Sequence, residues 1–152
     1  MDSRTFIVGS DHGGVSLRET LCEHLRTLGV EVASTLGPPD ASSSVDYPDV
    51  AGEVCRAVLE RPGSFGLLVC GTGQGMAISA NKVPGIRAGV VSDPFSARML
   101  RAHNDANVLC VGERVLGTEL AKVVLDAFVA QDFEGGRHQR RVSKIEPAGA
   151  GD

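Results

Sequence analysis

The chain has 152 residues, 42% of them hydrophobic and 4% aromatic, with a formal net charge of −4. The length predicts a single domain over residues 1–152. The acidic balance argues against nucleic acid as the main partner. No apolar stretch approaches the length of a membrane span, which argues against a membrane as a partner. The four cysteines are scattered without a C-x-x-C pair, which predicts reduced thiols in a cytoplasmic protein and neither a disulfide framework nor a metal site.

Short apolar runs alternate along the chain with stretches in which apolar residues recur every three or four positions. The first pattern predicts buried strands and the second amphipathic helices. In chain order the predicted elements are strand 5–9, helix 17–28, strand 30–34, a helix from about 48, strand 66–70, helix 76–80, strand 87–91, helix 93–102, strand 107–111 and helix 120–128. A flexible loop rich in serine and proline is predicted at 37–44.

This alternation predicts a parallel α/β fold with right-handed crossovers and helices on both faces of the sheet. We expect a three-layer α/β/α sandwich with five parallel strands in the flavodoxin-like order 2-1-3-4-5. A basic segment, residues 137–146, lies beyond this body, and we predict a terminal helix there that docks on a partner subunit. Residues 147–152 are predicted to be a frayed tail.

The central stretch of the chain, residues 66–81, predicts a strand, a glycine loop and a helix. Cys70 ends the strand, and Gly71, Gly73 and Gly75 leave the backbone amides of the loop open to a ligand. A helix start stabilises a nearby thiolate, so Cys70 is a candidate for chemistry. A buried packing cysteine is an equally good interpretation of this stretch alone. The loop matches neither a dinucleotide-binding nor a Walker A motif.

Polar residues follow three of the predicted strands. Asp11–His12, Cys70–Gly75 and Glu113–Arg114 all fall at carboxyl ends, where open α/β sheets bind ligands. The pair His103–Asn104 ends a helix and is therefore predicted at the opposite edge, from which it could reach the site of a neighbouring subunit.

Two arginines of the terminal helix, Arg137 and Arg141, are four residues apart and so share one helix face. Such a pair binds a phosphate through charge-assisted hydrogen bonds. A solvated charged face or a nucleic-acid patch is the alternative interpretation, because basic runs are common at chain ends.

Six segments together resemble the ribose-5-phosphate isomerase B family of sugar-phosphate isomerases, which also includes galactose-6-phosphate isomerase subunits. The segments are GSDHGG, DYPD, CGTGQGMAISANK, GIRA, HNDANVL and EGGRHQRR, which extend the resemblance over nearly the whole chain. The resemblance implies a cofactor-free aldose–ketose isomerase that interconverts ribose 5-phosphate and ribulose 5-phosphate in the pentose phosphate pathway. It also implies a homodimer, or a tetramer of paired dimers, whose sites use residues of both chains.

The resemblance also implies the roles of the site residues. Cys70 is the base that moves a proton between C2 and C1, and His103 is the acid that opens the furanose ring. Thr72 and the loop amides bind the enediolate. Some members of the family have serine in place of this cysteine and use a glutamate one turn later, but Gln74 stands there in this chain. The residues implied to bind substrate are Asp11, His12, Tyr47, Gly71, Gly73, Gly75, Asn104, Arg114, Arg137 and Arg141.

Two alternatives to ribose 5-phosphate isomerisation remain open at this stage. The substrate could be a six-carbon sugar phosphate, such as allose 6-phosphate or galactose 6-phosphate, with the loop 37–44 setting the length of the pocket. The chain could instead be a flavodoxin-like module that binds a phosphate or a nucleotide without turnover.

Overall fold

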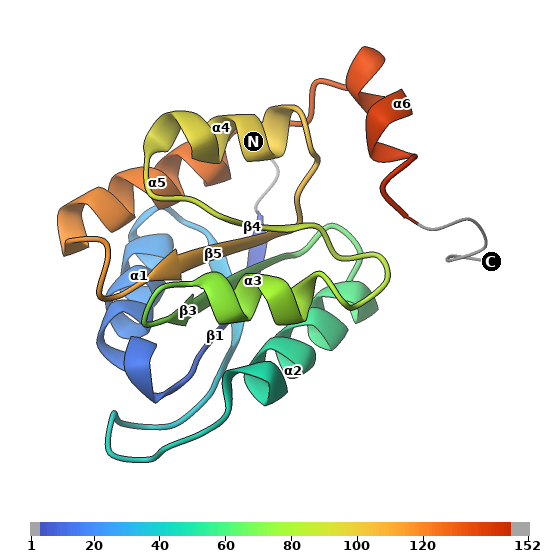
Figure 1. Ribbon diagram of the computed structural model, residues 1–152. Coiled ribbons are helices and arrows are strands. Elements are labelled where there is room, and N and C mark those ends of the chain that lie inside the picture. The colour runs from blue at the N-terminus through green and yellow to red at the C-terminus, as the bar shows by residue number, and fades with distance from the viewer. Residues whose placement is uncertain (1–3, 147–152) are drawn as a thin grey trace.

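The computed structural model describes residues 4–146 as a parallel β-sheet covered by helices on both faces (Figure 1). The five strands are β1 (Thr5–Ser10), β2 (Glu31–Leu36), β3 (Phe65–Cys70), β4 (Ala88–Val90) and β5 (Val108–Gly112). The helices are the 3-10 turn η1 (His12–Gly14), α1 (Val15–Thr27), α2 (Tyr47–Glu60), α3 (Gln74–Ala80), α4 (Pro94–Ala102), α5 (Thr118–Ala130) and α6 (Arg137–Val142). The predicted tail at 147–152 lies outside the described residues.

The predicted three-layer α/β class is confirmed, but the predicted strand order is wrong. The strands lie in the order β2-β1-β3-β5-β4, all parallel, so the last two strands exchange places. The burial of these two strands explains the exchange. All five residues of β5 are buried, whereas β4 has three half-buried residues and pairs only with β5. The more apolar strand therefore occupies the interior of the sheet and the short strand its edge.

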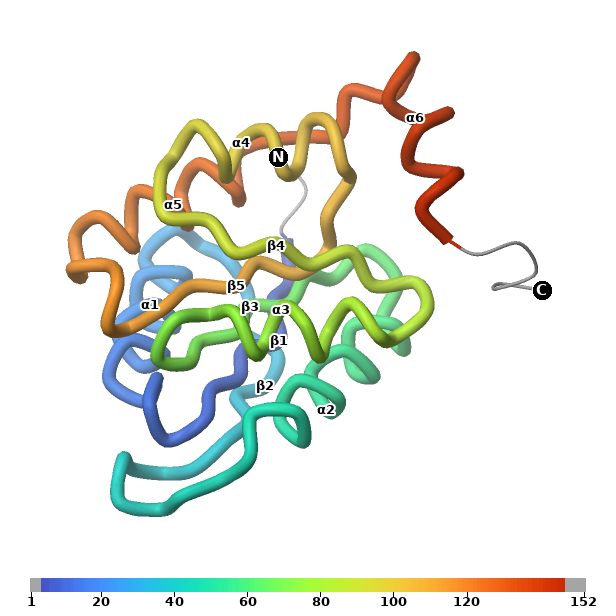
Figure 2. The backbone as a smooth tube through the Cα atoms, viewed as in Figure 1, coloured from blue at the N-terminus to red at the C-terminus, as the bar shows by residue number. Residues whose placement is uncertain are grey.

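The side chains of alternate strand residues belong to two separate hydrophobic cores. Phe6, Leu67 and Leu109 pack on one face with α1, α4 and α5, and Ile7 and Leu68 pack on the other face with α2 and α3. Figure 2 shows the same layers as a tube, with the sheet between the two sets of helices. Because side chains along a strand alternate in this way, the side chain at the end of β3 is directed to the α2 and α3 face.

The last helix, α6, stands apart from the sandwich and projects beyond the ends of α4 and α5 (Figures 1 and 2). It is shorter than predicted, because residues 143–145 form turns after the helix ends at Val142. His138 and Val142 are its buried residues, and its arginines are exposed. Within residues 4–146, no helix is both long and apolar enough to cross a membrane.

Candidate active site

The thiol of Cys70 lies where β3 meets the glycine loop. Its Sγ atom accepts a hydrogen bond from the Gly73 amide at 3.1 Å, and the residue is 5% exposed. Gly73 has φ of +82°, a left-handed conformation that favours glycine, and this conformation turns the amide back toward the sulfur. The loop therefore combines a candidate base with backbone donors.

Asp11 and His12 lie beside this loop, as predicted from their place after β1. The buried Asp11 carboxylate accepts a hydrogen bond from the Gly13 amide at 2.9 Å, which fixes the turn η1. The Cβ position of Gly13 is 3.5 Å from the Gly71 amide nitrogen, so the turn and the glycine loop are in contact. The His12 Nδ1 atom is 3.2 Å from the amide nitrogen and the carbonyl oxygen of Val45.

Tyr47 closes the same region from the start of α2. Its ring lies against Gly75, where an added Cβ would be 2.6 Å from the ring and would therefore collide with it. Asp11, His12 and Tyr47 line one open groove of about 490 Å³ together with the residues around them. The structure thus brings the loop that precedes α2 to the carboxyl edge of the sheet.

The two residues after β5 have different surroundings. Arg114 is exposed, and its Cδ and Nε atoms lie 3.6 and 3.8 Å from the Cβ position of Gly71. Glu113 turns away from the loop, because its carboxylate accepts the Leu17 amide at 2.7 Å in the first turn of α1. We name Asp11, His12, Tyr47, Cys70, residues 71–75 and Arg114 the carboxyl-edge group.

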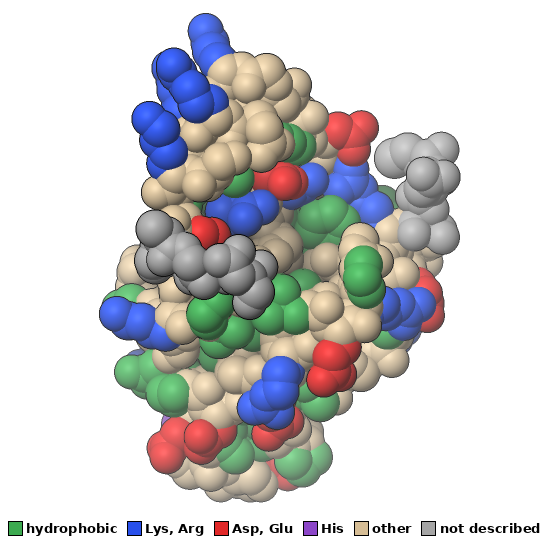
Figure 3. Space-filling model, turned by 90° about the vertical axis from the view of Figure 1, so that its right-hand side faces the viewer, with side chains coloured by type: hydrophobic (Ala, Val, Ile, Leu, Met, Phe, Trp, Pro, Cys, Tyr) green, Lys and Arg blue, Asp and Glu red, His purple; other side chains and the backbone are tan. Residues whose placement is uncertain are grey.

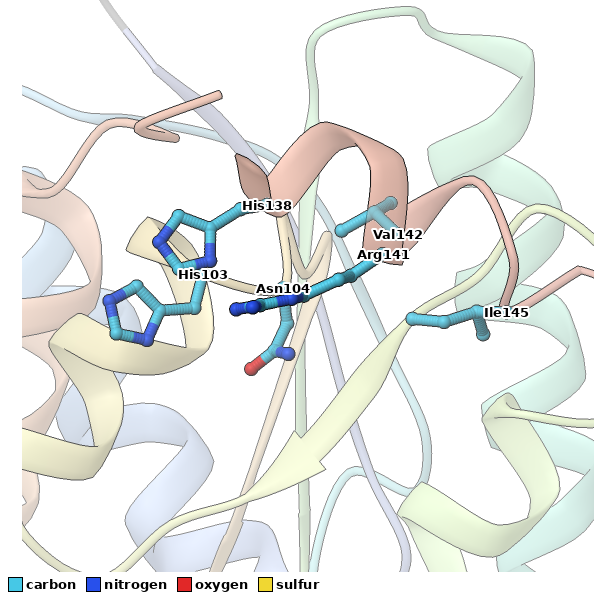
Figure 4. A pocket seen from close by; sticks show the side chains of 6 residues that line it. All are labelled: His103, Asn104, His138, Arg141, Val142 and Ile145. Atoms are coloured by element: carbon cyan, nitrogen blue, oxygen red, sulfur yellow. The ribbon is translucent and has the colours of Figure 1, made fainter. Parts of the chain in front are cut away.

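A second group of predicted site residues lies between α4 and α6. His103, Asn104 and Arg141 line a groove of about 320 Å³ with His138, Val142 and Ile145 (Figure 4). We call this groove the α6 groove. Figure 3 shows Lys and Arg side chains gathered at the top of the molecule, where α6 projects. Arg137 opens the same helix and is also exposed.

Within one chain the α6 groove and the carboxyl-edge group lie at opposite ends of the sheet. Arg87, just before β4, donates to the carbonyl oxygens of Asn104 and Asp105 at 2.9 and 2.8 Å, which places this loop at the amino edge. The five-residue strand β5 runs between the two edges and spans about 16 Å at roughly 3.3 Å per residue. A small sugar phosphate is shorter than this strand, so the two groups of one chain cannot both contact it.

Two residues of the α6 groove region were not predicted from the sequence. His138 and Glu134 lie beside His103, and the three form a compact group although the sequence showed no cluster of metal ligands. The i, i+4 spacing of Glu134 and His138 was a signal that could have found the pair, but not its contact with His103.

The remaining cysteines are free thiols inside the core. Burial raises the pKa of Cys22 and Cys110, and it raises that of Cys55 to about 11. These thiols are therefore protonated at neutral pH and act as packing residues.

A parallel α/β sheet with a thiol and a glycine loop at its carboxyl edge has the architecture of the open α/β proteins that bind ligands on their strand-end loops. A sequence profile of the Ribose/Galactose Isomerase family matches residues 6–145. The chain belongs to this family.

Named relatives agree with this membership. The chain is 47% identical over 137 residues to ribose-5-phosphate isomerase B of Escherichia coli, covering 90% of this chain and 91% of the relative. It is 39% identical over 138 residues to D-erythrulose-4-phosphate isomerase of Pectobacterium atrosepticum, covering 91% and 90%. The structure of ribose-5-phosphate isomerase B from Mycoplasma genitalium with bound ribulose 5-phosphate superposes with a TM-score of 0.88 and 40% identity, covering 94% of each chain.

Proposed function

We propose that the protein interconverts ribose 5-phosphate and ribulose 5-phosphate without a cofactor, in the cytoplasm and as a step of the pentose phosphate pathway. The observation that carries the proposal is the Cys70 sulfur, which accepts the Gly73 amide at the carboxyl edge of the sheet. The family membership supports the reaction class, and the E. coli relative supports the five-carbon substrate. The four free thiols agree with a reducing compartment.

In the proposed mechanism His103 first opens the furanose ring. His103 gives a proton to the ring oxygen as the bond from C1 to that oxygen breaks, while the C1 hydroxyl gives its proton to solvent water and becomes the aldehyde. His103 then regains a proton from solvent. Asp11 and Asn104 hold the sugar hydroxyls. The opened sugar then has a free carbonyl at C1 and an acidic hydrogen at C2.

The Cys70 thiolate next takes the proton from C2, which leaves an enediolate with negative charge on O1. Thr72 and the amides of Gly71, Gly73 and Gly75 stabilise this charge, and the loss of one such donor typically costs about 3 kcal/mol. The thiol returns its proton to C1 while a proton passes from the C2 hydroxyl to O1. Ribulose 5-phosphate results, and the thiolate is restored.

The site needs two copies of the chain, because one strand length separates the base from the ring-opening acid. We propose a homodimer, or a tetramer of two such dimers, in which α6 of one chain reaches the carboxyl-edge group of the other. The projection of α6 from the sandwich supports this arrangement (Figure 1). Tyr47 lines the pocket, and His12 and Arg114 join the arginines of α6 around the phosphate.

The proposed activity is tested by a panel of aldose phosphates with four, five and six carbons, assayed in the presence of a chelator. Ribose 5-phosphate is expected to give the highest kcat/KM, with turnover unaffected by the chelator. One relative of this chain is a D-erythrulose-4-phosphate isomerase, so the panel must determine how many carbons the preferred sugar has. A higher kcat/KM for allose 6-phosphate or galactose 6-phosphate would contradict the five-carbon assignment. Tight binding of a sugar phosphate without any turnover would favour the non-catalytic module.

The phosphate clamp gives a separate prediction. Arg137→Ala is expected to raise KM for ribose 5-phosphate by roughly 10- to 100-fold, because a charge-assisted pair contributes about 1.5–3 kcal/mol. Steady-state kinetics measures this change, and kcat should fall less than KM rises. The matched control is Arg140→Ala, an exposed arginine of the same helix that lies outside the predicted clamp. Equal effects of the two substitutions would contradict the assignment of Arg137.

A further inference from the structure

Two residues outside the predicted site surround the proposed ring-opening acid. The His138 ring stacks on the His103 ring, with centroids 4.1 Å apart and planes inclined by 11° (Figure 4). Glu134 Oε2 lies 3.5 Å from Nε2 of His138 and 3.9 Å from Nε2 of His103. One carboxylate oxygen thus faces the same nitrogen of both rings.

The three side chains differ in how deeply they are buried. The His138 side chain is 7% exposed, whereas those of His103 and Glu134 are 38% and 52% exposed. The buried His138 ring therefore forms the surface on which the more exposed His103 ring rests. The Glu134 amide donates to the Ala102 carbonyl at 3.0 Å, which ties the loop before α6 to the end of α4.

The turn of the chain between Glu134 and His138 contains two glycines. Gly135 and Gly136 both have positive φ, 67° and 55°, so the chain turns sharply into α6 at this point. The His138 amide donates to the Gly135 carbonyl at 3.0 Å within this turn. One loop thereby delivers both the carboxylate and the stacked ring to His103.

A bound metal ion does not fit this arrangement of rings. The three ligand atoms lie within 4.8 Å of one another, a separation that a cation could bridge. An imidazole binds a metal in the plane of its ring, however, and two stacked, nearly parallel rings share no such point at a bonding distance of about 2.1 Å. The geometry instead suits one ring that supports the orientation of the other.

We propose that Glu134 and His138 are positioning residues that hold the His103 ring in the orientation needed to protonate the sugar ring oxygen. The inference rests on the proposed role of His103. Burial, followed by the nearby His103 and Arg137, lowers the pKa of His138, which keeps its ring neutral at pH 7. A neutral ring stacks on a protonated His103 without repulsion between like charges. Arg141, which lines the same groove, is a further positive charge that lowers the pKa of His138.

The test compares a reaction that requires ring opening with a reaction that does not. Ribose 5-phosphate must open before it isomerises, whereas ribulose 5-phosphate is already acyclic, because its C5 oxygen carries the phosphate. Exchange of the C1 hydrogen of ribulose 5-phosphate with deuterium from D₂O therefore needs the base but not the ring-opening acid. Glu134→Gln is expected to lower kcat for ribose 5-phosphate by roughly 10- to 100-fold, the cost of a misplaced catalytic group, and to leave exchange unchanged.

A double-mutant cycle gives the second readout. In a His103→Asn background Glu134→Gln should produce no further loss, because a positioning residue has nothing left to position. His138→Phe, which keeps an aromatic ring in the stack, should retain more kcat than His138→Ala. The matched control is Glu119→Gln, which removes an exposed carboxylate that pairs with Lys122, away from the α6 groove.

Three results would overturn the positioning role. They are an unchanged kcat in Glu134→Gln, an equal loss of turnover and exchange, or losses that multiply in the cycle with His103→Asn. A wild-type protein that does not convert ribose 5-phosphate would instead refute the proposed function itself. The two failures are therefore distinguishable.

Discussion

Cys70→Ala is expected to abolish isomerisation while leaving the fold and phosphate binding intact. The thiol is the proposed base in both proton transfers, and general acid–base catalysis typically contributes 10²–10⁴-fold, so we expect kcat to fall by about 10³-fold. Exchange of the C1 hydrogen of ribulose 5-phosphate with D₂O should be lost to the same extent. Steady-state kinetics and NMR detection of deuterium incorporation measure the two effects.

The fold should tolerate this substitution, because it removes one sulfur atom from the end of a strand. We expect the free energy of unfolding to fall by about 1 kcal/mol, the common size for a point substitution. Binding of a linear phosphorylated sugar acid, measured by calorimetry, should stay within about threefold of wild type, since the phosphate contacts are unchanged. Cys55→Ala is the matched control, because it removes a buried thiol on the same core face and lies outside the site. Turnover that persists in Cys70→Ala would remove this residue from the mechanism.

His103→Asn is expected to separate the two halves of the reaction. Turnover of ribose 5-phosphate should fall by roughly 10²-fold, because ring opening loses its acid. Exchange into ribulose 5-phosphate should continue at nearly the wild-type rate, since that reaction begins from an open chain and needs only the base. Parallel assays of turnover and deuterium exchange on the same preparation measure the difference.

The residue next to His103 provides the control for this prediction. Asn104→Ala removes a group predicted to hold a sugar hydroxyl, so it should affect turnover and exchange to a similar extent. If His103→Asn lowers both reactions equally, the residue binds substrate or supports the base, and its assignment as the ring-opening acid is incorrect.

Much of the fold was predictable from local patterns in the sequence. The alternation of strands and helices follows from apolar spacing, and the parallel sheet follows from that alternation. The order of the last two strands was not predictable in this way, because it depends on competition for the interior of the sheet. The residues of β5 fill both cores, while those of β4 stay half-buried. In the sequence, β4 and β5 differ visibly only in apolar content and in length.

The candidate site likewise has features that were predictable from the sequence and features that were not. Asp11 and Cys70 were predictable as neighbours, because the carboxyl ends of adjacent parallel strands meet at one edge. The contact between Tyr47 and Gly75 depends on how the long loop before α2 returns to the sheet, and no local pattern encodes it. The stack of His103 and His138 depends likewise on the turn into α6. The roles of all these residues stay predictions until variants are assayed.

The central claim is that each site combines the carboxyl-edge group of one chain with the α6 groove of another. Mixing the inactive variants Cys70→Ala and His103→Asn under conditions that exchange subunits tests it directly. If sites form between chains, half of the dimers are mixed and each carries one intact site, so the mixture should recover about one quarter of wild-type activity. A mixture that stays as inactive as its components, despite proven subunit exchange, would contradict the account.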